Sequence, residues 1–261
     1  MLFSLFKYKN YRAYQYIQWA SVLAALGKWS SYLVAITVGS SKNLLLTLPT
    51  AVGTVVGNVI CTQMSKKHEP AKLLKNCGAY SMIAATLVFL SCFIQTKMNI
   101  YFLGGWNSIF FYVFYFVFGI TIGIQELSTS HLAVEFYDYL EWQTGERIEV
   151  IQCIIPDLIK SGLSYVKDLL IPFILLWIGY KSSDTGNLAE TMKAEPGYYS
   201  TCLWLVALLV FTYALGNVIK AFVLKYIYDI KGEKKEQMYT ELIEIRRKRH
   251  VENTNEVNPE V

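Results

Sequence analysis

The chain alternates between long apolar runs and short polar connections, and the apolar runs define its architecture. A helix of about 20 apolar residues crosses a bilayer, and six runs approach or exceed that length. A backbone in lipid must satisfy its own hydrogen bonds, so we expect helices rather than strands. The sequence therefore predicts an all-α membrane protein with six transmembrane helices, at roughly residues 14–38, 44–64, 77–94, 108–129, 151–178 and 199–226.

The overall composition agrees with a membrane protein. Of 261 residues, 54% are hydrophobic and only 17% are charged, which is more apolar than a soluble core requires. The five cysteines lie mostly in apolar runs without paired spacing, so we interpret them as small buried side chains. The sequence offers no nucleophile–base pair, phosphate loop or metal-ligand spacing. We therefore expect neither an enzyme nor a cofactor.

The basic residues are unevenly shared between the two ends of the predicted helices. One side carries 16 Lys and Arg in its connections and termini, and the other carries 4. Positive charge stays on the cytoplasmic side, so both termini are expected to be cytoplasmic, in a multi-pass protein of a prokaryotic plasma membrane. The predicted division is a six-helix bundle at residues 1–228 and a cytoplasmic tail at residues 229–261.

The tail is predicted to begin as an amphipathic surface helix and to end in disorder. Met238, Leu242 and Ile245 stand at helical spacing, and the last residues, "VENTNEVNPEV", are strongly polar. The run "RRKR", residues 246–249, fits the positive-inside pattern and is expected to contact anionic lipid. We do not expect it to bind nucleic acid.

Polar and charged residues inside the predicted fifth span fall on one helical face. Their steps from the first are 0, 3, 4, 7, 10 and 11, which repeats with the helical period. Charges within a membrane usually face a bundle interior or an aqueous cavity. The stripe is therefore either the lining of a transport pathway or a set of structural ion pairs. Its members are Asp157, Lys160, Ser161, Ser164, Lys167 and Asp168.

Other spans carry weaker polar signals. Asp157 and Lys160 lie one turn apart and can pair directly. Glu126 is either interfacial or a partner for the lysines of the fifth span. Gly53 and Gly57 form a GxxxG pair that favours close helix packing. A polar face is also predicted on the first span, where Lys28 is a further candidate for the pathway; it comprises Gln18, Ser21, Lys28 and Tyr32.

The densest cluster of charges follows the fourth span, in "VEFYDYLEWQTGERIE" at residues 134–149. This run resembles the signature between the tenth and eleventh helices of the glycoside–pentoside–hexuronide:cation symporters, the melibiose-carrier family of the major facilitator superfamily. Leu140 and Gln143 depart from the family's Gly and Lys. Glu135 stands where the family has Asp, and the matching residues are Asp138, Tyr139, Glu141, Trp142, Thr144, Gly145, Arg147 and Glu149.

Three further segments are similar to the same family. "SLFKYKNYR" resembles the loop that enters the seventh helix, "SKKHEPAKLLK" the basic loop after the eighth, and "LWIGY" the end of the eleventh. The resemblance covers nearly the whole chain but only the C-terminal six helices of a twelve-helix carrier. It implies that the coupling cation, Na⁺ or H⁺, binds in an N-terminal half that has no counterpart here. A transport lysine of the family aligns with Lys160, or one residue later with Ser161.

The resemblance implies one half of a cation-coupled sugar transporter. Its substrate would be a glycoside, pentoside or hexuronide, and its partners the lipid bilayer and a separate N-terminal half or a second copy. Asp138, Glu141 and Arg147 would then belong to a cytoplasmic gate, the alternative being a solvated loop. Two other functions stay open: an inactive remnant, and a membrane scaffold or regulatory subunit that transports nothing.

Overall fold

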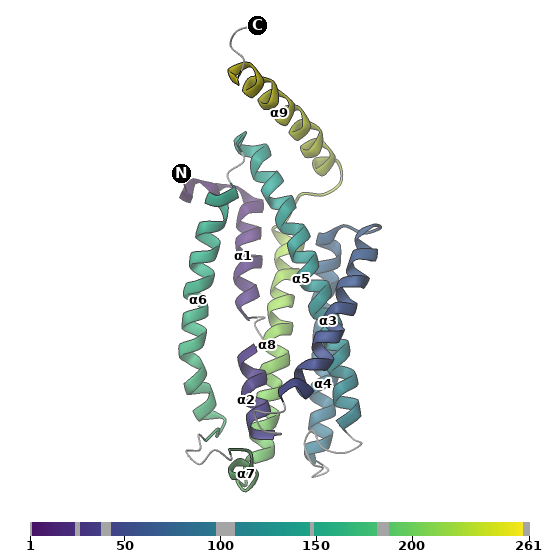
Figure 1. Cartoon of the computed structure of the whole chain (residues 1–261), viewed down its shortest axis with the longest axis vertical. Helices are drawn as coiled ribbons and strands as arrows, with labels where there is room; N and C mark the ends of the chain where they lie inside the picture. The colour runs from purple at the N-terminus through teal and green to yellow at the C-terminus, as the bar shows by residue number, and fades with distance from the viewer. Residues whose placement is uncertain are drawn as a thin grey trace.

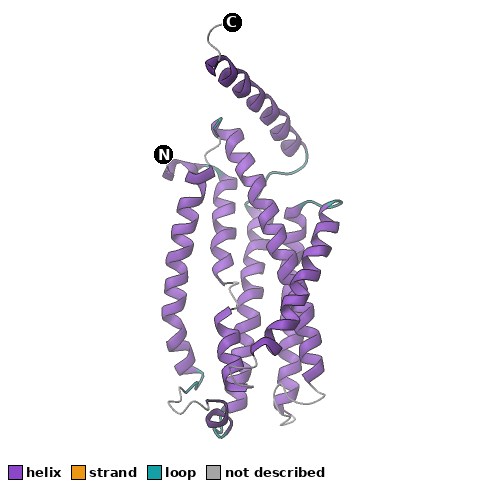
Figure 2. Ribbon diagram, in the orientation of Figure 1, coloured by secondary structure: helices purple, strands orange, loops and turns teal. Residues whose placement is uncertain are grey.

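The computed structural model describes residues 2–23, 27–37, 43–97, 108–146, 149–181 and 188–257. About 90% of it is helical, and the described residues contain no strand (Figure 2). The all-α prediction is therefore confirmed. The elements are η1 (Leu2–Lys7), α1 (Lys9–Leu23), α2 (Gly27–Thr37), α3 (Asn43–Ser65), α4 (Pro70–Lys97), α5 (Ser108–Thr144), α6 (Glu149–Trp177), α7 (Leu188–Lys193), α8 (Tyr198–Tyr226) and α9 (Glu233–Val257).

Three helices in the described part of the chain are long and apolar enough to cross a membrane, namely α4, α5 and α8. The long helices run side by side, and η1 and α9 lie at the same end of the bundle (Figure 1). At about 1.5 Å per residue, the 37 residues of α5 span more than the roughly 30 Å of a hydrocarbon core. Its polar C-terminal part therefore projects beyond the apolar layer, toward α9.

Glycines bring α3 and α5 into close contact. A Cβ atom built on Gly53 would lie 2.3 Å from the carbonyl oxygen of Phe116, and one on Gly57 would lie 2.2 Å from that of Ile120. From the opposite side, a Cβ on Gly123 would lie 2.1 Å from the carbonyl oxygen of Thr54. Only residues without side chains allow backbones to approach this closely, so the predicted packing role of the GxxxG pair is confirmed.

A buried apolar core joins α8 to the helices around it. Val206 and Val210 on α8 are fully buried with Phe118 on α5 and Val88 on α4. The described cysteines, which are Cys61, Cys77, Cys92 and Cys202, are buried and free, as expected. A second apolar cluster, between the projecting end of α5 and the tail, includes Phe136, Tyr228, Met238 and Leu242.

Several boundaries differ from the predicted ones. The predicted first span is divided between α1 and α2, with residues 24–26 outside the described part of the chain. The predicted fourth span ends at residue 129, whereas α5 continues to Thr144 because the charged motif is itself helical. The tail helix is confirmed, but α9 continues to Val257, inside the segment predicted to be disordered.

Candidate functional site

A polar cavity of about 720 Å³ lies among α1, α5, α6 and α8. Its position is notable because two of these helices, α5 and α8, are candidate membrane spans. Pockets of this size accept small molecules when a few polar groups converge in them. The lining consists of Tyr14, Gln18, Ser21, Ile122, Gln125, Glu126, Thr129, Ser130, Ala133, Tyr137, Lys160, Tyr213 and Lys220.

Lys220 is the most deeply buried charged residue of the cavity. Its exposed fraction is 0%, and its Nζ has no hydrogen-bond partner among the described residues. A lysine ammonium group carries three donors and is strongly hydrated in water. Burying it without a partner is costly, and intramembrane charges usually mark a functional site. Lys220 is therefore a fully buried charged residue at the lining of the cavity.

Lys160 on α6 and Glu126 on α5 line the same cavity. Both side chains are exposed, and both line the cavity with Lys220. No salt bridge joins Glu126 to either lysine in the described part of the chain. The structure thus places Glu126 near the lysine of the fifth span without pairing them, and it brings Lys160 into the same polar cavity as Gln18 and Ser21.

Hydrogen bonds fix the polar wall contributed by α5 and α8. The Tyr213 hydroxyl donates to Gln125 Oε1 at 3.0 Å, and Gln125 Nε2 donates to Thr129 Oγ1 at 3.2 Å. The Thr129 hydroxyl in turn donates to the backbone carbonyl of Gln125 at 2.7 Å. The amide of Gln125 is therefore held in one orientation, which presents a defined polar surface to the cavity.

The rest of the predicted stripe is spread over different environments. Asp157 and Ser161 are exposed, whereas Ser164, Lys167 and Asp168 are half-buried. The spacing allows Asp157 to pair with Lys160, but no ion pair joins these two described residues. Lys167 borders a separate apolar cavity of about 580 Å³. Lys28 lies in α2, but its side chain is outside the described residues.

The reason for this spread is the position of α6 at the side of the bundle. This helix packs mainly against α1 (Figure 1). Its large apolar side chains remain open to the surroundings; Leu158, Tyr165 and Leu169 have exposed fractions of 71%, 73% and 68%. A helix that contacts few neighbours can bury only a narrow face, so only part of a broad polar stripe reaches the interior.

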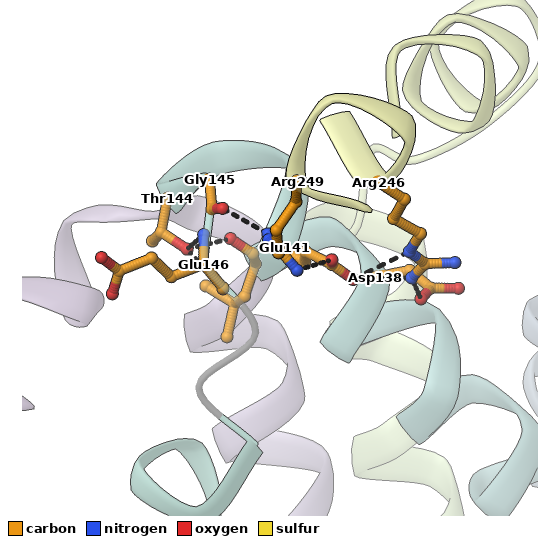
Figure 3. A network of polar contacts seen from close by, with 8 residues as sticks. Asp138, Glu141, Thr144, Gly145, Glu146, Arg246 and Arg249 are labelled. Carbon is orange, nitrogen blue, oxygen red and sulfur yellow. Dashed lines mark hydrogen bonds and ion pairs between the residues drawn. The ribbon is translucent and has the colours of Figure 1, made fainter. Parts of the chain in front are cut away.

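The charged motif forms a second site, at the projecting end of α5. Glu141 is almost fully buried, with an exposed side-chain fraction of 1%, and it binds two arginines of α9 (Figure 3). Arg246 Nη2 donates to Glu141 Oε2 at 2.6 Å, and Arg249 Nη1 donates to Glu141 Oε1 at 3.0 Å. Arg246 also bridges to Asp138 at 2.7 Å. We call these four residues the α5–α9 clamp.

Further contacts extend the clamp along both helices. Lys235 Nζ forms an ion pair with Glu135 at 2.7 Å, and the Tyr228 hydroxyl donates to the same carboxylate. Trp142 Nε1 donates to Glu241 Oε2 at 2.6 Å. Tyr139 packs edge-on against the Tyr8 ring. The motif residues Glu135, Asp138, Tyr139, Glu141 and Trp142 are therefore held by the chain's own ends.

The helix of the motif ends at Gly145, whose φ of +74° lies in the left-handed region. Glycine adopts this conformation without strain and commonly terminates helices. The Thr144 hydroxyl donates to the carbonyl of Leu140 at 2.7 Å, and Arg249 Nη2 donates to the carbonyl of Gly145. Arg147 lies outside the described residues. Glu149 begins α6, and its side chain is outside them too.

Two arginines of "RRKR" bind the charged motif of α5, so this run does not serve lipid contact alone. Arg246 and Arg249 bind the motif, while Arg247 and Lys248 are exposed. Burial acts to raise the pKa of Glu141, but hydrogen bonds from Arg246 and Arg249 outweigh it and hold this pKa below its usual range. The hydrogen bonds from Arg246 to Glu141 and Asp138 raise the pKa of Arg246. The pair of Glu141 and Arg246 is therefore ionised at neutral pH.

A third group of polar contacts fixes the loop before α9. Asn10 Nδ2 donates to Asp229 Oδ1, and Lys234 Nζ lies 3.0 Å from Asp229 Oδ2. Burial acts to raise the pKa of Asp229, but the hydrogen bonds from Lys234 and Asn10 outweigh it and keep the pKa low. Because Asn10 belongs to α1, this tie fixes the start of α9 against the N-terminal end of the bundle.

Sequence reasoning missed Lys220 and the partners of the motif. Tyr213, Asn217 and Lys220 stand at steps 0, 4 and 7 in α8, which places them on one helical face. That spacing could have identified the buried polar wall. The tail carries a comparable signal, since Lys235, Met238, Leu242, Arg246 and Arg249 are three or four residues apart and form the docking face of α9.

Comparison of the chain with protein-family models, curated proteins and solved structures found no match. The candidate function therefore depends on the polar cavity, on the clamp and on the sequence motif.

Proposed function

We propose that the protein is the C-terminal half of a cation-coupled sugar transporter of the major facilitator type. The observation that carries the proposal is the polar cavity, which brings Lys160 of α6 together with Lys220 of α8 and Glu126 of α5. Transporters of this class bind substrate between two six-helix halves, near the middle of the bilayer. A half-cavity lined by polar residues is the surface that such a half would contribute.

The motif in α5 supports the same proposal from the sequence. Its order of residues resembles the family signature, and the basic residues at the ends of the helices favour six spans with both termini in the cytoplasm. The clamp would then lie on the cytoplasmic side. An N-terminal half would supply the cation site and the other wall of the cavity. Without it, the chain would have no closed pathway for substrate.

The competing function is a membrane scaffold or regulatory subunit. The clamp favours it, because an α9 helix held by buried ion pairs presents Arg247 and Lys248 outward as a fixed basic surface. A scaffold would not need the unpartnered Lys220 in a polar cavity, however, because an unpaired buried charge only destabilises it. The cavity therefore favours the transporter.

The experiment that tests the proposal measures sugar uptake in cells that express this chain with an N-terminal half. Replacing Lys160 with Met removes the charge at the cavity wall, and we expect uptake to fall about ten- to a hundredfold, as for the loss of a charged hydrogen bond. Lys225→Met is the matched control, because Lys225 is exposed and lies outside the cavity. Equal uptake by both variants would reject a role for the cavity.

A further inference from the structure

The apolar cavity of about 580 Å³ lies among α1, α2, α6 and α8. On one side it is lined by Val166 and Leu170 of α6, and on another by Leu208 and Val223 of α8. It reaches into the bundle, because Val223 and also Trp29 of α2, which lines it too, are buried. No described residue lines both this cavity and the polar one. The apolar cavity is therefore a site of its own, beside the proposed pathway.

The length and lining of the cavity suit a hydrocarbon chain. At about 1.5 Å per residue, its lining extends about 16 Å along α6, from Leu163 to Ile174, and about 22 Å along α8, from Leu208 to Val223. The hydroxyl of Thr212, which also lines it, already donates to the carbonyl of Leu208 at 2.6 Å. An apolar space offers water few partners, and an empty one forfeits dispersion contacts along its walls. A long flexible chain would restore those contacts.

One charged group lines the cavity, the ammonium group of Lys167. Its side chain is half-buried, and its Nζ is not fully enclosed, unlike that of Lys220. The described lining contains no acidic residue, and no described residue forms an ion pair with Lys167. A charge inside a membrane usually pairs with an opposite charge. The cavity thus combines a hydrocarbon slot with a single accessible cation.

The depth of Lys167 decides which anion fits. It lies ten residues before Trp177, about 15 Å along the helix. Trp177 is largely exposed and packs against Trp204, and such indole rings favour the bilayer interface. With α6 as one of the proposed spans, Lys167 lies near the middle of a hydrocarbon core of about 30 Å, below the level of phospholipid phosphates. A single-chain carboxylate is not held at that level by a headgroup.

We propose that the apolar cavity binds a long-chain carboxylic acid. Its hydrocarbon chain lies between α6 and α8, and its carboxylate pairs with Lys167. The pair leaves no net charge in a low-dielectric surrounding, where an isolated ammonium group is costly. This inference goes beyond the proposed transport function and relies only on α6 crossing the bilayer.

The test measures quenching of tryptophan fluorescence in the full chain in detergent by dibromostearate, because Trp19 and Trp29 line the cavity and bromine quenches only at short range. Methyl dibromostearate is the neutral match. We expect saturable quenching by the acid, with a Kd about ten- to a hundredfold lower than that of the ester. Palmitate should displace the acid, whereas butyrate, which lacks the chain, should not. No saturable quenching, or an equal Kd for acid and ester, would overturn the proposal.

A charge variant assigns the carboxylate to Lys167. Lys167→Met keeps the length of the side chain and removes the charge, so the Kd for dibromostearate should rise about ten- to a hundredfold. The Kd for the methyl ester should stay the same. Lys225→Met is the control, because Lys225 is exposed and lies outside the cavity. An unchanged Kd for the acid in Lys167→Met would overturn the assignment.

A size variant assigns the chain to the cavity. Val166→Phe narrows the slot and should weaken binding of both the acid and the ester. Leu169→Phe is the matched control, because Leu169 is exposed on the same helix but does not line the cavity. Both positions are exposed, so neither change is expected to prevent folding. Equal binding by the two variants would overturn the location of the site.

A bilayer phospholipid is the alternative occupant. In nanodiscs of dibrominated phosphatidylcholine, palmitate should relieve part of the tryptophan quenching, because it excludes the brominated chains from the cavity. Quenching that palmitate does not relieve would overturn the proposal in favour of the phospholipid.

The binding test and the transport test fail independently, since binding requires no N-terminal half. Loss of sugar uptake with retained binding of the acid would reject the transporter and keep this site, and uptake without such binding would do the reverse.

Discussion

Glu141 of α5 is almost fully buried, and Arg246 of α9 donates two hydrogen bonds to its Oε2 atom, at 2.6 and 3.2 Å. A buried carboxylate is stable in this position only while its arginine partners remain. The pair therefore makes the docking of α9 depend on the charged motif, although the two residues are 105 positions apart.

Replacing Glu141 with Gln should loosen α9. The amide keeps the shape of the side chain but loses the ion pairs to Arg246 and Arg249, which are worth about 1–3 kcal/mol for charged hydrogen bonds. We expect the backbone amides of α9 to exchange with deuterium about ten- to a hundredfold faster, as measured by hydrogen-exchange mass spectrometry. Arg247→Gln, at an exposed position, is the control. Equal exchange in both variants would contradict the clamp.

The clamp should release at acidic pH. The pKa of Glu141 and that of Asp229 are lower in the folded protein than in the unfolded chain. Their contribution to stability is therefore fully present above the unfolded values of about 4 and is lost as the pH falls through the lower folded values. The Tm should decline more steeply below pH 5 in the unmodified chain than in Glu141→Gln. If the Tm of the two proteins declined in parallel, the Glu141 carboxylate would not be a source of the acid sensitivity.

The contact between α3 and α5 should not tolerate a side chain. A Cβ on Gly57 would lie 2.2 Å from the carbonyl oxygen of Ile120, so Gly57→Ala should force the helices apart and destabilise the fold by about 1–3 kcal/mol or more. Gly162 on α6 is the matched control, because nothing lies within 4 Å of its built Cβ. Gly162→Ala should keep or slightly raise the Tm. A Tm for Gly57→Ala that matches this control would show that the helices do not pack so closely.

The proposed orientation is open to labelling in intact cells. We expect a cysteine at Ala194, near α7, to react with a membrane-impermeant maleimide from outside, and one at Glu233, at the start of α9, to react only after permeabilisation. Both positions are exposed. The background would lack the five native cysteines. Labelling of both positions from the same side would contradict a membrane crossing by α8, which lies between them.

The helical class and most helix positions could be predicted from the sequence, because the length and hydropathy of a run depend on local composition. The GxxxG contact was also predictable from Gly53 and Gly57. The partner of a charged residue was not, since it depends on which helices pack together. Lys220 was overlooked within an apolar run, and Arg246 was assigned to lipid because nothing local indicates that it reaches Glu141.

The helical structure of the charged motif was likewise not predictable from local sequence. Its charges indicated a loop between spans, yet residues 135–144 continue α5. A charged segment remains helical when another helix neutralises it, and here α9 supplies Lys235, Arg246 and Arg249. Only tertiary structure reveals this compensation.

The most direct test of the proposed transporter is sugar uptake into proteoliposomes under an imposed cation gradient. The chain would be reconstituted alone, and together with a candidate N-terminal six-helix half. The proposal predicts cation-dependent uptake only when both halves are present, because one bundle offers half a cavity. Absence of uptake in both preparations would contradict it and leave the scaffold or the inactive remnant as the function of the chain.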